Sequence, residues 1–462
     1  MTDTEQPPNP SSFSRRTFVR TSGIAVGGAL IGAAVQEPET AHAVPSSAPR
    51  ITHGVVTGDV THESALVWSR ASGEARMHVE WGTAPGSTAG KRRTTAATTL
   101  SADRDFTGQF ALHELEPDTD YWYRVVAQDA QSRAESMVAR FRTAPAPGQS
   151  ASVRFTWGGD VGQGMANRPP FASFGSIAEE QPAFFIFNGD TIYGDSTTPV
   201  GPGAKTRQEF WAKYKENRQD PLFQALALST PTIINWDDHE VDNDYRGNVP
   251  TLGPGRQAFT DYWPVSSRPP TTTYRSIRWG RELEIFVLDT RQFADPLDAP
   301  DGPAKTMLGE AQRNWLARGV RSSSARWKVI VTSCPLSILR SANPPQDDWV
   351  SYEHELGTLL NGWRDAKVAD IVWLTADVHW GQAIKYPEYG MWEFVGCPIG
   401  ANPRVESKPL SPTFEPEETF LGLSERYYGS VAIDSGSATM TVDLKGEDGA
   451  LRHRTVIPSA AR

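Results

Sequence analysis

The chain has 462 residues, of which 38% are hydrophobic, and a formal net charge of -10. This length exceeds that of one small domain and allows a large enzyme core together with an accessory module. The acidic balance argues against nucleic-acid binding through a generally basic surface, so we expect an anionic substrate to be attracted locally.

The first 43 residues have the pattern of an export leader. Arg15 and Arg16 precede a mildly apolar run at 23–35, and Ala41-His42-Ala43 offers a small-x-small cleavage site. This arrangement resembles a twin-arginine export signal. The apolar run is shorter than the about 20 residues that cross a bilayer, and no second run of that length follows. We therefore expect export by the twin-arginine machinery to the periplasm, the cell surface or the medium, with no transmembrane segment in the mature chain.

Residues 44–143 alternate between short apolar-polar runs and turn clusters, which is typical of a small β-sandwich. The expected strands are 64–69, 77–81, 110–112, 121–127 and 138–141. Residues 115–121, before the longest of these strands, resemble the turn of fibronectin type III-like domains. Pro and Gly residues at 144–150 then predict a linker.

Residues 151–462 change to buried strands that are separated by longer, partly helical stretches. The expected strands are 153–157, 184–188, 232–236, 283–288, 327–332 and 370–374, and helical patterns cover 206–228 and 309–322. The predicted fold is an α/β layered catalytic domain that follows a small N-terminal all-β domain of immunoglobulin or fibronectin type.

Acidic residues recur at the carboxyl ends of the predicted catalytic strands. These acids are Asp160, Asp190, Asp237, Asp238, Asp289 and Asp377. Any one of them alone would be a common turn or helix N-cap residue. Because ligand sites in open α/β sheets lie at this edge, the recurrence predicts converging carboxylates, whose mutual repulsion cations would relieve. His239 and His379, which closely follow two of these acids, favour a metal site.

The two cysteines, Cys334 and Cys397, form neither a disulfide framework nor a zinc-binding pattern. Each lies in or beside an apolar segment, where a buried free thiol behaves as a small hydrophobe. Because the sequence does not give their separation, a disulfide and two free thiols both stay open.

Five motifs surround these acids in chain order. They are Gly159-Asp160-Val161-Gly162-Gln163-Gly164, Asn188-Gly189-Asp190-Thr191-Ile192-Tyr193, Trp236-Asp237-Asp238-His239-Glu240-Val241, Leu288-Asp289-Thr290-Arg291 and Thr375-Ala376-Asp377-Val378-His379. Their types and order resemble those of alkaline phosphatase D-like metallophosphoesterases, over nearly the whole mature chain. The resemblance implies a layered metallophosphoesterase sandwich and an exported enzyme that hydrolyses phosphate esters by metal-activated hydroxide.

The resemblance also implies roles for single residues. The residues that look like ligands of a trivalent iron are Asp160, Asp190, Tyr193 and His379, with Asp190 bridging to one or more divalent ions. The residues that look like ligands of a second metal, often calcium in this family, are Asp238, Asp377 and Asn243. Other divalent metals stay open, since oxygen-rich ligands suit several hard cations.

The chain departs from the family pattern in two places. Better-characterised members have Ser-Cys-Gln where this chain has Gly159-Asp160-Val161, so a thiolate ligand is replaced by a carboxylate and the site becomes less selective for iron. The segment Thr332-Ser333-Cys334-Pro335 also lacks the further histidine that the wider metallophosphoesterase superfamily supplies before its final histidine motif.

Two metals would neutralise the phosphate oxygens and lower the pKa of bound water towards about 7. His239 is then the predicted general acid for the leaving alkoxide, and a plain metal ligand is its alternative role. Arg246 and Arg291 are candidates for holding the phosphate, although Arg291 could instead pair with Asp289 or another acid.

Two other functions stay open. One is a phosphodiesterase or phospholipase D-type activity, which needs a pocket wide enough for two substituents. The other is a non-catalytic binding module in which calcium only braces the fold, and the position of His239 beside a candidate ligand argues against it.

Overall fold

The computed structural model describes residues 48–85, 92–162, 164, 167–266, 272–340 and 346–460. The predicted leader at 1–43 lies outside these residues. Within the described ranges, no helix is both long enough and apolar enough to cross a membrane.

The N-terminal part is all-β, as the alternating pattern predicts. Its strands are β1 (Ile51–Gly58), β2 (Ala65–Ala71), β3 (Ala75–Gly82), β4 (Arg93–Thr94), β5 (Thr98–Leu100), β6 (Thr107–Leu112), β7 (Asp120–Gln128), β8 (Arg133–Glu135) and β9 (Ala139–Arg142). In β7, Tyr121, Tyr123 and Val125 are buried and alternate with more exposed residues, because successive side chains point to opposite faces. These residues pack into one apolar core with β2, β3 and β6.

Three N-terminal strands, β1, β2 and β6, belong to a sheet that continues into the catalytic part of the chain. Strand β1 pairs with β2 on one side and, in parallel, with β12 (Thr232–Asn235) on the other, through Gly58 and Thr232. The resulting nine-stranded sheet has the order β22-β21-β20-β10-β11-β12-β1-β2-β6. The domain boundary at 144–150 stays a prediction, and a shared sheet crosses it.

Two sheets form the centre of the catalytic part. The nine-stranded sheet contributes β10 (Val153–Gly158), β11 (Phe185–Asn188), β12, β20 (Tyr427–Asp434), β21 (Thr439–Gly446) and β22 (Leu451–Pro458). The facing sheet consists of β13 (Arg275–Trp279), β14 (Leu283–Val287), β15 (Trp327–Val331), β16 (Ile371–Thr375), β17 (Gly381–Tyr386), β18 (Met391–Gly396) and β19 (Glu417–Gly422). One apolar core fills the space between them, with Phe155, Ile186, Val329 and Val372 among its fully buried members.

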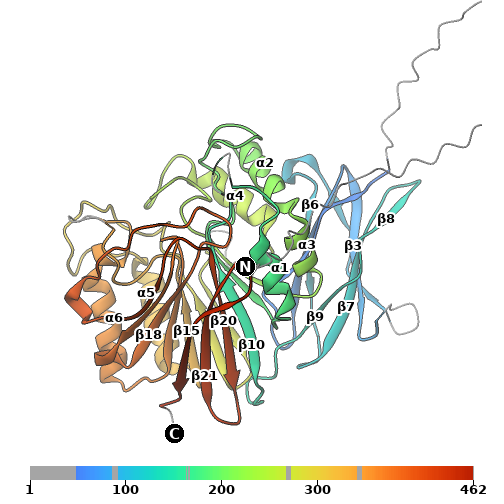
Figure 1. Cartoon of the computed structure of the whole chain (residues 1–462). Helices are drawn as coiled ribbons and strands as arrows, with labels where there is room; N and C mark the ends of the chain where they lie inside the picture. The colour runs from blue at the N-terminus through green and yellow to red at the C-terminus, as the bar shows by residue number, and fades with distance from the viewer. Residues whose placement is uncertain are drawn as a thin grey trace, which may run out of the picture. The chain divides into compact units, whose positions relative to one another are not determined.

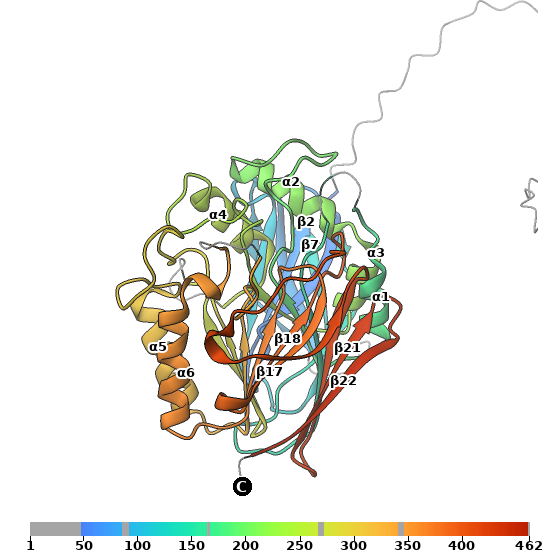
Figure 2. The same cartoon turned by 60° about the vertical axis from the view of Figure 1, so that its left-hand side comes forward.

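Helices cover the outer faces of both sheets. Helices α1 (Ala172–Glu179), α2 (Arg207–Arg218), α3 (Pro221–Ala227) and α4 (Leu252–Tyr262) share a core with β11 and β12. Helices α5 (Gly309–Ser322) and α6 (Glu353–Asp365) pack on β14, β15 and β16 (Figures 1 and 2). Short 3-10 turns lie at Ala102–Arg104, Trp349–Ser351, Pro387–Tyr389 and Pro412–Phe414. This arrangement confirms the predicted layered α/β sandwich.

The single helical pattern at 206–228 is wrong in one respect, because it contains two helices. Helix α2 begins at a capping box formed by Thr206 and Glu209. Helix α2 ends at Arg218, and Asp220 caps the start of α3, because its side chain accepts hydrogen bonds from two backbone N–H groups of α3. Pro221 occupies the first position of α3, where its missing N–H costs nothing.

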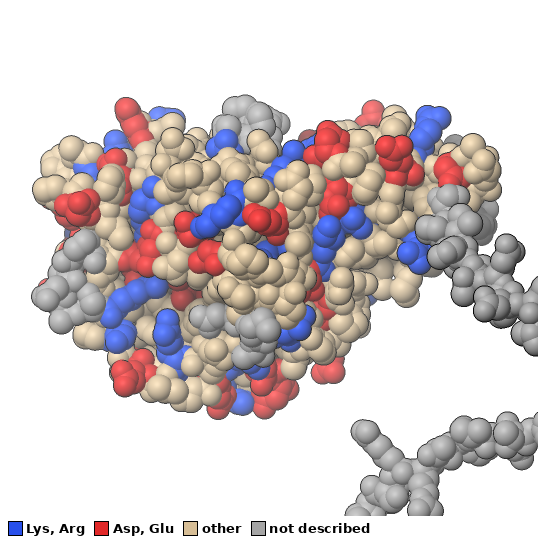
Figure 3. Space-filling model, turned by 90° about the horizontal axis from the view of Figure 1, so that it is seen from above, with Lys and Arg blue, Asp and Glu red and all other residues tan. Residues whose placement is uncertain are grey.

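Charged side chains are mixed on the surface. On the face that Figure 3 shows, Lys and Arg are interspersed with Asp and Glu, without a continuous basic area among the described residues. On this face, positive and negative charges therefore lie close together instead of forming separate areas of one sign.

Candidate metal centre

The strand-end acids converge at one edge of the two facing sheets. Strands β10, β11 and β12 run parallel in one sheet, and β14, β15, β16 and β18 run parallel in the other. Parallel strands present their carboxyl ends together, so the acids that follow them meet. Asp160, Asp190 and Asp238 are each 1% exposed, and Asp377 is half-buried.

One side chain ties the two sheets together beneath these acids. Asn188, the last residue of β11, donates from Nδ2 to the carbonyl oxygens of Thr332, at 2.9 Å, and Leu374, at 3.2 Å, which lie at the ends of β15 and β16. Gly189 follows with φ 83°, and a Cβ there would lie 2.7 Å from the Cβ of Asp237. Only glycine fits this close approach.

Four predicted ligands have left-handed backbone conformations. The φ angles are 65° at Asp160, 49° at Asp190, 69° at Asp377 and 64° at His379. Such conformations are uncommon for residues other than glycine, and clusters of them occur at functional sites where the surroundings impose them. The turns after β10, β11 and β16 therefore aim these side chains at a common point.

His379 lies between Asp160 and Tyr193. Its Nε2 is 3.3 Å from Asp160 Oδ1 and 2.9 Å from the Tyr193 hydroxyl. Its Nδ1 lies 2.8 Å from the carbonyl oxygen of Asn402, which can only accept a hydrogen bond. The carbonyl therefore fixes the proton on Nδ1 and leaves the lone pair of Nε2 directed at the acids, as in histidines that ligate metals.

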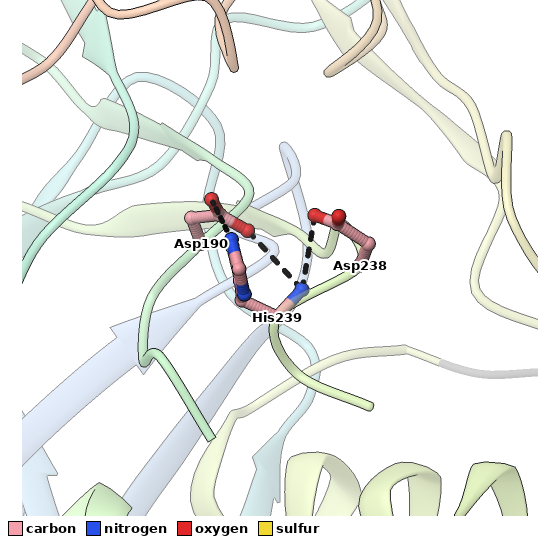
Figure 4. A group of neighbouring side chains, drawn as sticks. All are labelled: Asp190, Asp238 and His239. Atoms are coloured by element: carbon pink, nitrogen blue, oxygen red, sulfur yellow. Dashed lines mark hydrogen bonds and ion pairs between the residues drawn. The ribbon is translucent and has the colours of Figure 1, made fainter. Parts of the chain in front are cut away.

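His239 lies on the other side of the cluster, between Asp190 and Asp238. Its backbone N–H points to Asp238 Oδ1 at 3.0 Å and Asp190 Oδ1 at 3.4 Å, and its Nε2 is 4.0 Å from Asp190 Oδ2 (Figure 4). Its Nδ1 is 2.7 Å from Asp195 Oδ1. The ring also packs on Tyr193, with ring centroids 4.1 Å apart.

Asp195 is a site residue that sequence reasoning missed. It does not follow a strand, so the pattern of strand-end acids cannot find it. The only sequence signal is its place two residues after Tyr193, in the same loop as Asp190. Its second oxygen accepts the backbone N–H of Asn243 at 3.2 Å, which fixes the carboxylate against the histidine.

Arg291 is fully buried beneath the acids. Its Nε hydrogen-bonds to Asp237, and its Nη1 lies 2.6 Å and 2.8 Å from the two oxygens of Asp347. Its Nη2 has no hydrogen bond within the described residues and lies 3.6 Å from Asp238 and 3.8 Å from Asp377. The side-chain hydrogen bonds of Arg291 thus go to Asp237 and Asp347, and its longer ion pairs go to Asp238 and Asp377.

Asp289 has a structural role in the described contacts. It accepts hydrogen bonds from Thr273 Oγ1 at 2.6 Å and from the backbone N–H groups of Arg291 and Gln292. This is the turn-capping behaviour that any single strand-end acid suggests. Arg246 also has structural partners, because it pairs with Asp347 and donates to its carbonyl oxygen at 2.9 Å.

Asn243 and its neighbour Asp244 differ in their contacts. Both residues are exposed, and no described contact joins the side chain of Asn243 to another predicted ligand. The backbone N–H of Asp244 lies 2.6 Å from Asp238 Oδ2, and one carboxylate oxygen each from Asp238, Asp244 and Asp347 lie within 4.8 Å of one another.

The electrostatics of this cluster fit bound cations. Burial and the charges of Asp238, Asp237 and Asp160 raise the pKa of Asp190 well above its usual range. Asp160 Oδ1 and Asp190 Oδ2 are buried and have no hydrogen-bond partner in the described part of the chain. Buried carboxylate oxygens normally have partners, and cations would both supply them and remove the repulsion.

The pKa of His239 shows the same acidic field. Burial alone would lower this pKa, but the charge of Asp238 and the hydrogen bond to Asp195 raise it to about 9.

The two cysteines take no part in a disulfide, since Cys334 and Cys397 are both buried free thiols. The question that the sequence left open is thereby answered.

Comparisons with known proteins identify the family of the chain. A family model described as PhoD-like phosphatase matches residues 157–444, and the model of the N-terminal domain of PhoD-like phosphatases matches residues 36–145. Alkaline phosphatase D of Bacillus subtilis (strain 168) is 25% identical over 424 residues, which cover 80% of this chain and 72% of the relative.

Solved structures give the same picture of the fold. A structure of PhoD superposes with a TM-score of 0.73 at 20% identity and covers 87% of this chain and 88% of its own. The purple acid phosphatase PPD1 of yellow lupin (Lupinus luteus) superposes with a TM-score of 0.66 at 16% identity, over 89% and 74% of the two chains.

Proposed function

The chain belongs to the PhoD-like phosphatase family, and from this premise we propose that the strand-end acids hold the metals of its phosphoesterase site. It is a metal-dependent phosphoric ester hydrolase whose substrates are phosphate esters. The observation that carries the proposal is the convergence of four acids, Asp160, Asp190, Asp238 and Asp377, at one edge of two facing sheets.

The first metal position would use Asp160, Asp190, Tyr193 and His379. Supporting this set, Nε2 of His379 lies within hydrogen-bonding distance of the Tyr193 hydroxyl and 3.3 Å from Asp160. Burial, with the charges of Asp190 and Asp160, raises the pKa of Tyr193 well above its ordinary value. Only a strongly charged cation would convert such a buried phenol to the phenolate, which favours a trivalent ion such as iron(III).

The second metal position would use Asp238 and Asp377, with Asp190 as the bridge. Its ligands are carboxylate oxygens, which suit calcium or another hard divalent cation. Asp244, whose carboxylate lies within the acidic cluster, is a better third ligand than Asn243, whose side chain has no described contact with the other predicted ligands.

Metals bound in these positions would supply Lewis-acid neutralisation of the phosphate oxygens and a nucleophilic water at neutral pH. The chain itself handles the proton of the leaving group. Asp195 holds the Nδ1 proton of His239 and thereby directs Nε2 towards the cluster, where it can donate to the departing alkoxide. The Nη2 group of Arg291 faces the same space and adds a fixed positive charge.

The export signal is a separate part of the proposal. It rests on the arginine pair and the cleavage pattern of the leader, which lies outside the described residues. Transport in the folded state would allow the protein to receive its metals before export.

A phosphodiesterase activity is the second candidate function. A cavity of about 350 Å³ adjoins Asp377, and it provides room for a substituent beyond the phosphate. The non-catalytic binding module has no comparable support, because the matching family model is described as a PhoD-like phosphatase.

The proposal is tested by metal analysis and a substrate panel on the same preparation. Protein purified from the exported fraction is expected to contain at least two metal equivalents and to hydrolyse both an aryl monoester and an alkyl monoester. A preparation with intact fold, full metal content and no turnover of any mono- or diester would reject the function. Iron together with calcium in the preparation would support these two metals as the occupants of the two positions. Two other divalent ions would assign the positions to those ions instead.

A further inference from the structure

A cavity opens directly beside the candidate metal centre. Its volume is about 350 Å³, within the range of small-molecule sites, and its wall includes Asp377, Trp380, Arg340, Arg404, Glu406 and Lys408. Because Asp377 belongs to both the metal centre and the cavity, a phosphate ester bound at the centre would extend its alcohol part into this space.

The positively charged side chains that line the cavity differ in their hydrogen bonds and ion pairs. Arg340 donates to both oxygens of Asp348, at 2.6 Å and 3.0 Å, and also pairs with Asp377. Arg404 and Lys408 have no side-chain hydrogen bond or ion pair to any residue that the structure describes. These two positive groups are therefore available to a ligand, and Glu406 is the negative group nearest to them along the chain.

The segment that carries Arg404 and Lys408 is held by backbone hydrogen bonds at both ends. At one end, the backbone N–H of Arg404 donates to the carbonyl oxygen of His379 at 2.9 Å. At the other end, Leu339 donates to Pro409 at 2.9 Å and Ser411 donates to Ser337 at 2.7 Å, both between backbone groups. The segment is thus attached to a predicted metal ligand on one side and to the chain before Arg340 on the other.

We propose that this cavity is a subsite for a second anionic group, so that preferred substrates are phosphate esters whose alcohol part carries its own negative charge. The inference rests on the proposed function and specifies its substrate class. A protein with net charge -10 repels such substrates, with two anionic groups, at long range, so their binding requires local positive charge. Arg404 and Lys408 supply that charge within the cavity that adjoins the metals.

The test compares two small esters that differ in one charged group. Glycerol 3-phosphate has a neutral alcohol part, and 3-phosphoglycerate has a carboxylate on an alcohol part of similar size. The assay uses the metal-loaded full-length chain at low ionic strength. The double variant Arg404→Gln/Lys408→Gln should lower the ratio of kcat/KM for 3-phosphoglycerate to kcat/KM for glycerol 3-phosphate about 5–10-fold. Glu406→Gln should change the same ratio in the opposite direction, because it removes a repelling charge.

A matched control removes two charges elsewhere. Arg318 and Arg321 lie exposed on α5, and their replacement by glutamine should leave the ratio of the two kcat/KM values unchanged. An equal loss for both esters in the cavity variant, or an unchanged ratio in both cavity variants, would overturn the subsite while leaving the proposed function intact. A wild-type enzyme that turns over neither ester nor any aryl phosphate would instead overturn the proposed function, and the subsite with it.

Discussion

Replacing Asp195 with asparagine tests how the chain positions its proposed general acid. The variant removes the negative charge that lies 2.7 Å from His239 Nδ1 but keeps the size of the side chain. A hydrogen bond to a charged group contributes about 1.5–3 kcal/mol, and about 1.4 kcal/mol corresponds to a factor of ten in rate. We therefore expect kcat for an alkyl phosphate to fall roughly 10–100-fold.

The assay that separates positioning from general damage uses leaving groups of graded pKa. Esters of acidic phenols leave without help from an acid, so Asp195→Asn should slow them much less than it slows alkyl esters. His239→Ala should show the same selectivity with a larger loss, about 10²–10⁴-fold on alkyl esters. In the double variant the two effects should not add, because Asp195 acts only through His239.

Two results would contradict the proposed roles of Asp195 and His239. Equal losses on alkyl and aryl esters, with metal content retained, would remove Asp195 and His239 from proton transfer. Loss of metal in His239→Ala would assign that histidine to the ligands, which is the alternative role that the sequence left open.

Three further predictions concern other parts of the chain. Burial alone would raise the pKa of Glu80, but hydrogen bonds from Arg124 and a second arginine lower it from 4.5 to about 2. This carboxylate therefore stabilises the fold above about pH 4.5 and loses that effect as the pH falls towards 2. Glu80→Gln should lower the free energy of unfolding by about 1–3 kcal/mol at pH 7. In thermal melts, the difference between the wild type and the variant should shrink over that acidic range. Tyr193→Phe should abolish any visible charge-transfer absorption, and a colourless wild-type enzyme with full activity would exclude iron(III) ligation. Replacing Arg15 and Arg16 with lysine should retain the precursor in the cell, and normal export of that variant would contradict the twin-arginine assignment.

The location of the site is the feature that the sequence predicts best. Buried strands of this kind have continuous apolar runs, so their ends are visible, and Asp160, Asp190 and Asp377 stand at those ends. The rule that ligands bind at the carboxyl ends of parallel strands then brings them together without any knowledge of distances. Helix α5 was predictable for a similar reason, since its periodic pattern at 309–322 coincides with its observed bounds.

The supporting contacts of the site could not be predicted in the same way. Arg291 pairs with Asp237 and Asp347, which are 54 and 56 residues away in the chain, and no local pattern marks such partners. The same limit applies to Asn188, which joins the two sheets through carbonyl groups of β15 and β16. The pairing of β1 with β12 is also long-range, so the sequence pattern could not predict that one sheet contains strands from both sides of residues 144–150.

The most direct test of the account is the metal content of Asp190→Asn, measured by elemental analysis together with phosphatase activity. Asp190 is the proposed bridge, so its loss should deplete both metal positions and reduce activity by at least about 10³-fold, because one carboxylate serves two ions. Asp289→Asn, another buried acid at a strand end, is the matched control and should keep its metals if its fold survives. Full metal occupancy and activity in folded Asp190→Asn would contradict the central claim that the converging acids form the metal centre.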